Sequence, residues 1–233
     1  WDVQRVTGNG FVSLFDSDFG SLHNGDVSTW NVLGATSLQM TFQNLKAFNQ
    51  PLNAWDVSKT KFLAFTFNGA ESFNQDLSSW DTSRVTYMGY TFSGAKAFNQ
   101  DLSSWDTSKV KEFGGIFAKT SAFNQPLKDW ATNSLSGNLG ISGAFLRAKL
   151  FDQDLSRWDV HDATSLSQTF QGAAIFDSSV ATWDIARVTT LKSTFYDATN
   201  FDQNLSSWDV SKVYTMEWTF RNAKQFDSDI SSW

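Results

Sequence analysis

The segment Phe73-Asn-Gln-Asp-Leu-Ser-Ser-Trp80 returns 25 residues later as Phe98-Asn-Gln-Asp-Leu-Ser-Ser-Trp105, identical at every position. Variants of this segment follow one another along the whole chain. Ten of the eleven tryptophans keep its phase, at 25-residue spacing except for intervals of 29 and 28: Trp1, Trp30, Trp55, Trp80, Trp105, Trp130, Trp158, Trp183, Trp208 and Trp233. A fixed period of this length is typical of a repeat protein in which each unit packs on its neighbours.

Phenylalanine occupies two further positions of the repeat. One lies seven residues before the Trp, as in Phe48, Phe73, Phe98, Phe123, Phe151, Phe176, Phe201 and Phe226. The other lies twelve residues after it, or fifteen in the coil with an insertion, as in Phe42, Phe67, Phe92, Phe117, Phe145, Phe170, Phe195 and Phe220. These positions take up sixteen of the 22 phenylalanines. We therefore predict a core of stacked aromatic layers rather than a closed globular centre.

Local patterns suggest the elements of each repeat. In Leu191–Ala198, apolar residues at i, i+4 and i+7 predict a short helix. In Trp208–Val210, two apolar residues flank an Asp, which predicts a short strand. The expected fold class is an α/β solenoid, a leucine-rich-repeat-like right-handed coil of about nine 25-residue repeats, with short parallel β-strands on one side and short helical turns on the other.

The expected domain organisation is a single repeat solenoid over residues 1–233. Its first coil, 1–30, is irregular, and the coil 130–158 carries an insertion of three residues. The sequence begins with Trp rather than Met, so we expect it to be a segment of a longer protein.

Composition argues against several classes of function. The net charge is −6, with an isoelectric point near 4.8, so no basic excess is present to neutralise the phosphates of a nucleic acid. No apolar run reaches the ~20 residues that span a bilayer. There is no cysteine, no phosphate-binding glycine loop and no metal-binding histidine motif. We expect no catalytic residues, no cofactor and no enzymatic activity.

A repeat converts one sequence position into a row of side chains. The residue after the Trp gives an acidic row: Asp56, Asp81, Asp106, Asp159, Asp184 and Asp209. Three residues on lies a basic row: Lys59, Arg84, Lys109, Arg187 and Lys212. The two rows are candidates for a mixed-charge recognition face. The preferred alternative is mutual neutralisation with Asp capping the following turn, because surface ion pairs stabilise little.

The residue after the first Phe of each repeat forms another polar row. It is Asn in the first half (Asn24, Asn49, Asn74, Asn99 and Asn124) and Asp in the second (Asp152, Asp177, Asp202 and Asp227). We expect the Asn side chains to hydrogen-bond the turn backbone of an adjacent coil. For the Asp residues, exposure, pairing with backbone N–H groups and cation binding remain open. The pairs Asp152/Asp154 and Asp227/Asp229 are calcium candidates, although turn capping is preferred.

Other features lie outside the repeat pattern. Tyr87, Tyr90, Tyr196, Tyr214 and Trp218 are out of phase with the core positions, which makes them candidates for surface contacts. The sequon Asn204-Leu-Ser206 is a possible glycosylation site.

The repeat resembles a known family. Phe73–Phe92 and Phe201–Met216 are similar to the repeat of BspA-type leucine-rich-repeat surface proteins, which includes mycoplasma lipoprotein repeats of about 25 residues. This chain has Thr where that repeat usually has Met, directly before the second Phe. The resemblance implies a leucine-rich-repeat-like fold, an extracellular or cell-surface location, and adhesion or binding.

The functional expectation combines these points. We expect a non-catalytic cell-surface or secreted module that mediates adhesion or protein–protein binding, with a protein or a glycan as its surface partner. The alternative is a structural spacer or subunit whose contacts are with copies of itself, end to end.

Overall fold

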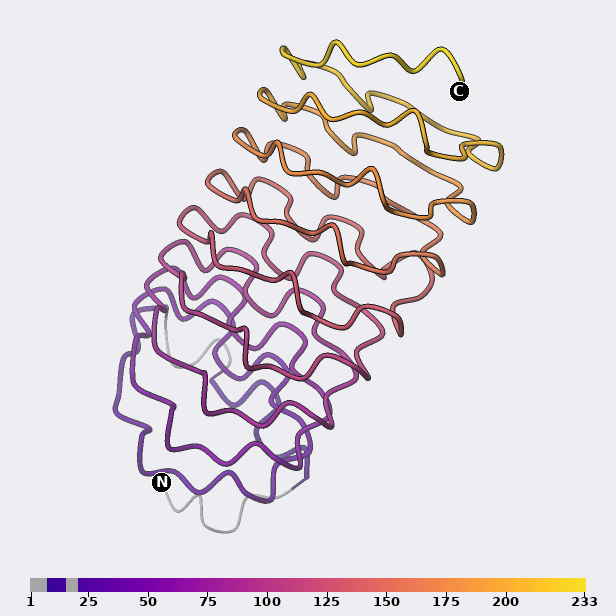
Figure 1. Cartoon of the computed structure of the whole chain (residues 1–233). Helices are drawn as coiled ribbons and strands as arrows, with labels where there is room; N and C mark the ends of the chain where they lie inside the picture. The colour runs from indigo at the N-terminus through magenta and orange to yellow at the C-terminus, as the bar shows by residue number, and fades with distance from the viewer. Residues whose placement is uncertain (1–7, 16–20) are drawn as a thin grey trace.

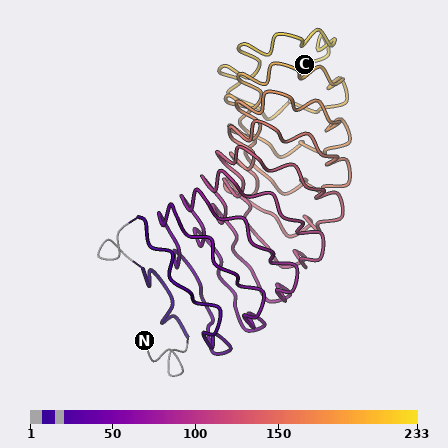
Figure 2. The same cartoon turned by 90° about the vertical axis from the view of Figure 1, so that its left-hand side faces the viewer.

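A computed structural model of the chain describes residues 8–15 and 21–233. The backbone winds around one axis, and successive windings of about 25 residues stack along it from the N-terminal to the C-terminal end (Figure 1). The stack is curved when viewed from the side (Figure 2). We call a set of residues at the same position in successive windings a column. The predicted irregular coil 1–30 lies partly outside the described residues.

The predicted α/β solenoid is wrong in its elements. The described residues contain neither a helix nor a strand longer than a single β-bridge. In the segment predicted to be helical, Ser193 and Asp197 have left-handed backbones, with φ of 56° and 57°. Their amides, and that of Phe195, donate to carbonyls of the next winding, whereas the amides of Thr194 and Tyr196 form i→i−3 turns. Because alternate amides point along the stack, no i→i−4 helical ladder can form.

This left-handed pair recurs in winding after winding, four residues apart. The first column contains Ser13, Met40, Phe65, Tyr90, Gly115, Gly143, Gln168, Ser193 and Trp218, and the second contains Asn44, Gly69, Gly94, Lys119, Arg147, Gly172, Asp197 and Asn222. Most of these residues are not glycine, although a left-handed conformation costs such residues roughly 1–2 kcal/mol. The bonds between windings hold the backbone in this conformation.

The predicted strand at Trp208–Val210 is also absent. The amide of Trp208 closes a turn onto Leu205, and that of Val213 closes a turn onto Val210, so the extended piece between them is too short for a ladder. Parallel bridges occur elsewhere, at one residue per winding, seven residues after the Trp. They link Ser37 to Phe62, Phe62 to Tyr87, Tyr87 to Glu112, Ser165 to Thr190, and Thr190 to Thr215. Two further bridges, Gly8 to Ala35 and Gly137 to Ala163, lie near the irregular and insertion-bearing coils.

The core consists of the repeat aromatics, as the sequence predicts. Within each winding the two Phe rings stack with centroids 3.9–4.1 Å apart, as in Phe92 and Phe98. Rings in neighbouring windings stack in turn, with Phe67 and Phe92 at 5.5 Å and Trp80 and Trp105 at 6.2 Å. The buried residues form one continuous cluster from Phe11 to Trp208. Each layer therefore covers the next, which a single repeat cannot achieve.

Polar groups inside the core also join the windings. The indole N–H of Trp105 donates to the carbonyl of Leu77 in the preceding winding at 3.1 Å, and the other repeat tryptophans from Trp55 to Trp233 do the same. The fully buried Thr91 hydroxyl lies 2.8 Å from the carbonyl of Met88 and 3.0 Å from that of Leu63. These contacts explain why this chain has Thr where the similar BspA-type repeat usually has Met, because a Met side chain has no hydroxyl to donate.

The Asn row does hydrogen-bond the adjacent coil. Oδ1 of Asn74 accepts the amide of Asn99 at 2.9 Å and the side-chain Nε2 of Gln100 at 3.0 Å. The row continues without a break where Asn becomes Asp: Asp152 and Asp202 accept the amides of Asp177 and Asp227. Asn and Asp share the side-chain oxygen that accepts the amide. Of the three alternatives left open for the Asp residues, the structure therefore shows pairing with backbone N–H groups.

Candidate functional site

A groove lies over the N-terminal half of the stack, with a volume of about 480 Å³. Phe62 and Tyr87 form one wall, and Phe65 and Tyr90 form the other. The floor and ends are made by Gln39, Ala64, Gly89, Glu112, Gly114 and Leu139. We call this the aromatic groove. Its walls and floor are three columns of the repeat, so it runs along the stack axis.

The backbone explains how the walls arise. Phe62 and Tyr87 occupy the bridge column, and Phe65 and Tyr90 occupy the first left-handed column three residues later. The rings stack within each wall, Phe62 on Tyr87 at 5.7 Å and Phe65 on Tyr90 at 4.9 Å. All four side chains are half-buried and lie outside the core cluster.

Small residues keep the floor open. Ala64, Gly89 and Gly114 follow one another in the column between the walls, where later windings carry Ser167, Lys192 and Glu217. At Gly114 an added Cβ would come within 2.8 Å of the carbonyl oxygen of Leu139. Beside it, the Tyr90 ring occupies the space where a side chain at Gly115 would begin, 2.3 Å from the position of a Cβ. Longer side chains in these positions would fill the groove.

Two backbone donors are left without acceptors in the floor. In four other windings the amide of the floor column is bonded by a hydroxyl two residues earlier: Gln39 by Ser37, Ser167 by Ser165, Lys192 by Thr190 and Glu217 by Thr215. Phe62 and Tyr87 occupy the same column but have a ring carbon where Ser and Thr have the hydroxyl oxygen. Among the described residues, the amides of Ala64 and Gly89 donate no hydrogen bond. Such amides favour a ligand that supplies oxygen atoms.

The floor carbonyls, by contrast, are already engaged. Those of Ala64, Gly89 and Gly114 accept the amides of Met40, Phe65 and Tyr90, respectively. At the end of the groove, Glu112 is half-exposed, and within residues 8–15 and 21–233 no cationic group lies within 4.0 Å of its carboxylate. The backbone of the floor thus offers free donors and engaged carbonyls, and Glu112 adds one negative charge without a cationic partner among the described residues.

The predicted acidic row caps turns. Oδ1 of Asp56, Asp81 and Asp106 accepts the amide of the serine two residues on, at 2.9–3.0 Å, and Asp159, Asp184 and Asp209 accept equivalent amides. The hydroxyl and amide of that serine lower the pKa of Asp56, Asp81, Asp106 and Asp209. The prediction that Asp caps the following turn is confirmed. All six side chains remain exposed.

Among the described residues, no side chain of the predicted basic row lies within 4.0 Å of a carboxylate of the acidic row. Lys109 lies close enough to lower the pKa of both Asp81 and Asp106, but its Nζ donates to the carbonyl of Ser83 at 2.8 Å. Arg187 pairs with Asp162, a residue outside the predicted row. Lys59, Arg84 and Lys212 are exposed. The two rows lie side by side on the surface, and their role as a recognition face stays a prediction.

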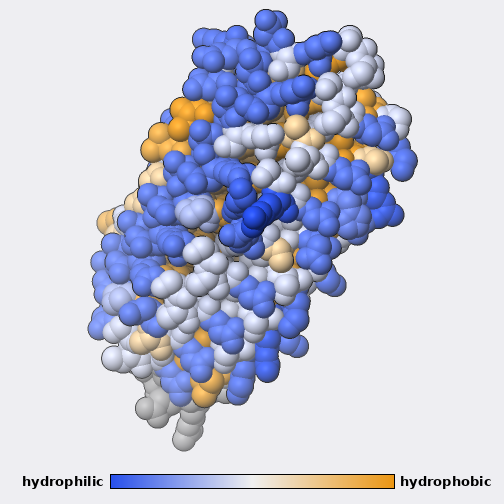
Figure 3. All heavy atoms as spheres, in the orientation of Figure 1, coloured by the Kyte–Doolittle hydropathy of each residue, from blue (hydrophilic) through white to orange (hydrophobic). Residues whose placement is uncertain are grey.

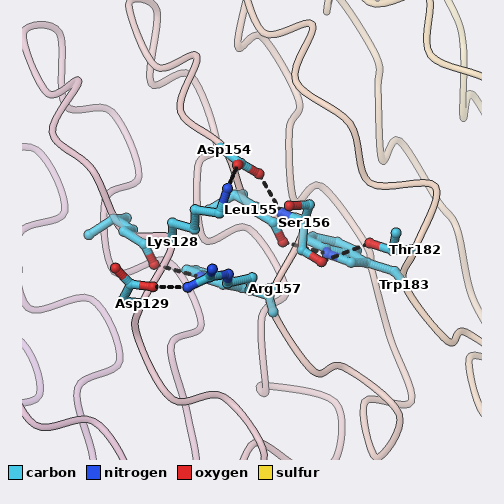
Figure 4. Close-up of polar contacts among 10 residues, drawn as sticks. Lys128, Asp129, Asp154, Leu155, Ser156, Arg157, Thr182 and Trp183 are labelled. Atoms are coloured by element: carbon cyan, nitrogen blue, oxygen red, sulfur yellow. Dashed lines mark hydrogen bonds and ion pairs between the residues drawn. The ribbon is translucent and has the colours of Figure 1, made fainter.

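Other ion pairs join neighbouring windings. Figure 4 shows Lys128 reaching Asp154 while Arg157 reaches Asp129, with Nη1 and Oδ1 2.6 Å apart. Beside them the Trp183 indole donates to the Leu155 carbonyl at 3.1 Å. The face seen in Figure 3 is mainly hydrophilic, with smaller apolar areas between the polar residues.

Of the four calcium candidates, Asp152, Asp154 and Asp229 each have a separate partner, and only the backbone amide of Asp227 is bonded, to Asp202. Asp152 accepts the amide of Asp177, Asp154 caps Ser156 and pairs with Lys128, and Asp229 caps Ser231. Within the described ranges, no three His, Asp or Glu side chains gather in a way that could hold a metal ion. Asn204 of the sequon is exposed, and its Oδ1 accepts the amide of Ser206 at 2.9 Å.

Sequence reasoning found half of the groove. It identified Tyr87 and Tyr90 as surface aromatics, and they are partly exposed walls. It missed Phe62 and Phe65, although both are out of phase with the Phe positions of the repeat. Of the other out-of-phase aromatics, Tyr214 is 79% exposed and Trp218 is 49% exposed. Applying the same criterion to phenylalanine, namely an aromatic residue outside the repeat positions, would have included all four wall residues.

Comparison with known proteins adds a family. In the part of the chain that the structure describes, no helix is long and apolar enough to cross a bilayer. The comparison with curated proteins gave no significant match. A family model described as "Mycoplasma protein of unknown function, DUF285" matches three segments, residues 1–84, 60–138 and 139–233, which together extend over the whole sequence. The chain is therefore a repeat protein that belongs to the DUF285 family of Mycoplasma proteins.

Proposed function

We propose that this chain is a non-catalytic, cell-surface or secreted binding module, and that the aromatic groove is where it holds a macromolecular partner. One observation carries the proposal: Phe62, Phe65, Tyr87 and Tyr90 line a groove instead of entering the core. Half-buried aromatic side chains around a concave apolar site are typical of binding sites. Their large ring surfaces contribute much of the binding free energy when a ligand removes them from water.

The absence of catalysis is supported by how the polar side chains are used. The acidic row caps turns, and the Asn/Asp row bonds the adjacent coil. Side chains repeated in every winding for packing do not form the single, distinct constellation that a catalytic site requires. The resemblance to BspA-type surface proteins supports an extracellular location and a binding role.

The test uses substitutions taken from the repeat itself. Phe62→Thr, Tyr87→Thr and Tyr90→Gln place at each position a residue that the same column carries elsewhere, in Thr190, Thr215 and Gln168. The matched control is Tyr214→Thr, which removes an exposed tyrosine outside the groove, where equivalent windings have Thr86 and Thr189.

The immobilised chain is exposed to a panel of purified extracellular macromolecules: gelatin, a mucin and heparin. We expect at least one to bind the wild type and the Tyr214→Thr control equally, and to lose most of its binding to the triple groove variant. If no member binds, or if the triple variant binds as well as the wild type, the groove is not the binding site. Protease treatment of intact cells tests the location, since a surface protein is cleaved without lysis.

The alternative function, a structural subunit joined end to end to copies of itself, stays a prediction. Light scattering on the isolated chain over a range of concentrations tests self-association.

A further inference from the structure

We propose that the aromatic groove binds a proline-rich peptide segment of the partner in the polyproline II conformation, with a Lys or Arg side chain of that segment beside Glu112. This inference rests on the proposed binding function and assigns the ligand class. Four independent features of the groove carry it: the exposed parts of its rings, its spacing, its hydrogen-bonding groups and its charge.

The walls present ring edges rather than ring faces. Phe62 and Tyr87 are inclined by only 19°, and Phe65 and Tyr90 by only 7°, so within each wall the inner faces cover one another. Tyr90 also lies against Gly115. A sugar ring is held best by an open aromatic face. A groove between ridges of ring edges instead fits compact, rigid pyrrolidine rings, as aromatic-lined grooves that bind polyproline II segments do.

The spacing of the windings matches that helix. Parallel bridges join the wall residues Phe62 and Tyr87, and Tyr87 and Glu112, which sets successive windings about 4.8 Å apart. A polyproline II helix rises about 3.1 Å per residue with three residues per turn, or roughly 9.3 Å per turn. Two windings therefore match one turn of the ligand to within about 0.5 Å. A peptide lying along the stack axis would meet the walls in phase.

The backbone groups of the floor select a ligand segment with acceptors and few donors. The amides of Ala64 and Gly89 have no acceptor among the described residues, whereas the floor carbonyls at Ala64, Gly89 and Gly114 already accept amides. A peptide added as a β-strand would bring as many N–H groups as carbonyls. Proline has no N–H, and the carbonyls of a polyproline II segment make no internal bonds. The donor excess of the floor thus fits a proline-rich backbone.

The charge fixes the orientation of the ligand. Glu112 stands at one end of the groove, and no cationic group of the described residues lies within 4.0 Å of its carboxylate. At the other end Gln39 is neutral. A basic residue at one terminus of the peptide would pair with Glu112, and the reversed peptide would lose that pair. Such a charge contributes mainly to specificity.

Isothermal titration calorimetry on the full chain tests the proposal with three synthetic probes. The first is a capped ten-residue peptide of nine prolines and a terminal arginine. The second replaces alternate prolines by glycine, which removes the preformed conformation. The third replaces the arginine by glutamine. Chitotriose serves as the glycan probe. We expect the first peptide to bind, the glycine peptide to bind about tenfold more weakly or worse, and chitotriose not to bind.

Variants then assign the contacts. Phe62→Thr and Tyr87→Thr should each weaken binding of the first peptide by about tenfold or more, as expected for aromatic anchors, while Tyr214→Thr leaves it unchanged. Phe62→Val removes the ring but adds no hydroxyl to bond the Ala64 amide, so it should weaken binding less than Phe62→Thr. Glu112→Gln should weaken the arginine peptide about three- to tenfold and leave the glutamine peptide unaffected. Thermal unfolding of each variant shows that the stack is intact.

Three results would overturn the proposal: no heat of binding with millimolar peptide, equal affinity for the glycine peptide, or groove-dependent binding of chitotriose instead. If the peptides fail while gelatin, mucin or heparin still requires the groove, the ligand class is wrong and the binding function stands. If neither peptide nor macromolecule requires the groove, both proposals fail.

Discussion

The Asn/Asp row is best tested at Asn74, where Asn74→Ala removes one acceptor that serves two donors. Oδ1 of Asn74 accepts the amide of Asn99 at 2.9 Å and Nε2 of Gln100 at 3.0 Å. Gln100 keeps a second acceptor, the carbonyl of Asn74 at 3.1 Å, so only the Asn99 amide loses its acceptor. Leaving a partly buried amide without a partner costs about 1–3 kcal/mol. Because both residues are half-buried, we expect a loss of about 1–2 kcal/mol in the free energy of unfolding.

The control is Asn74→Asp, the residue found in this column at Asp152, Asp177 and Asp202. It keeps the acceptor, and no bond of the Asn74 side-chain N–H₂ group is lost, so stability should change by less than about 0.5 kcal/mol at pH 7. Urea unfolding followed by tryptophan fluorescence measures the free energy of unfolding of both variants. Thermal unfolding should show a drop in Tm of roughly 2–8 °C for Asn74→Ala. If the Asp variant is as destabilised as the Ala variant, or if the Ala variant is as stable as the wild type, the acceptor does not link the windings.

Two further predictions address the backbone and a surface charge. Lys119→Gly should stabilise the protein by up to about 1 kcal/mol, and Gly94→Ala should destabilise it by about 1 kcal/mol, because both positions are left-handed (φ of 60° and 73°) in the same column. The Cβ at Gly94 would meet only ordinary contacts at 3.4 Å, so changes of the same sign in urea unfolding would contradict a backbone origin. Nδ1 of His161 donates a hydrogen bond to Oδ1 of Asp159 at 2.7 Å, which raises the pKa of His161, with Asp162 adding to it and Arg187 opposing it. A raised folded-state pKa gives stability below the unfolded value that is lost as pH rises through the folded value. The NMR titration midpoint of His161 should therefore lie above about 6.5 and fall in Asp159→Asn; a midpoint that this variant leaves unchanged would refute the assignment.

The sequence identified those structural features that arise when one residue type recurs at a fixed interval. Trp105, Phe92 and Phe98 lie in the stacked core. An aromatic residue that recurs in every repeat can be buried each time only if the repeats stack on one another. The bond from Asn74 to the next coil and the turn cap at Asp81 follow similarly, since short polar side chains bond nearby backbone. The repeat itself is readable without coordinates, and the DUF285 family model matches it, whereas the assignment to BspA-type leucine-rich-repeat proteins stays a prediction.

The elements within a winding could not be predicted in this way. Leu191, Phe195 and Ala198 have helical spacing, yet all three enter the core from a chain of turns with left-handed residues at Ser193 and Asp197. Apolar spacing reports only which side chains face inward. Whether an amide bonds within its winding or to the next one depends on how closely the windings approach.

The sequence by itself therefore determined the repeat, the aromatic layers and the polar rows, because each is set by residue type at one position. Tertiary structure decided the conformation of each winding and the existence of the groove. Phe62, Phe65, Tyr87 and Tyr90 become two walls only when neighbouring windings stack, and the amides of Ala64 and Gly89 become available only because those rings stand where other windings have hydroxyl groups. Contacts between residues 25 apart come from packing the windings together, and that packing is a property of the whole stack.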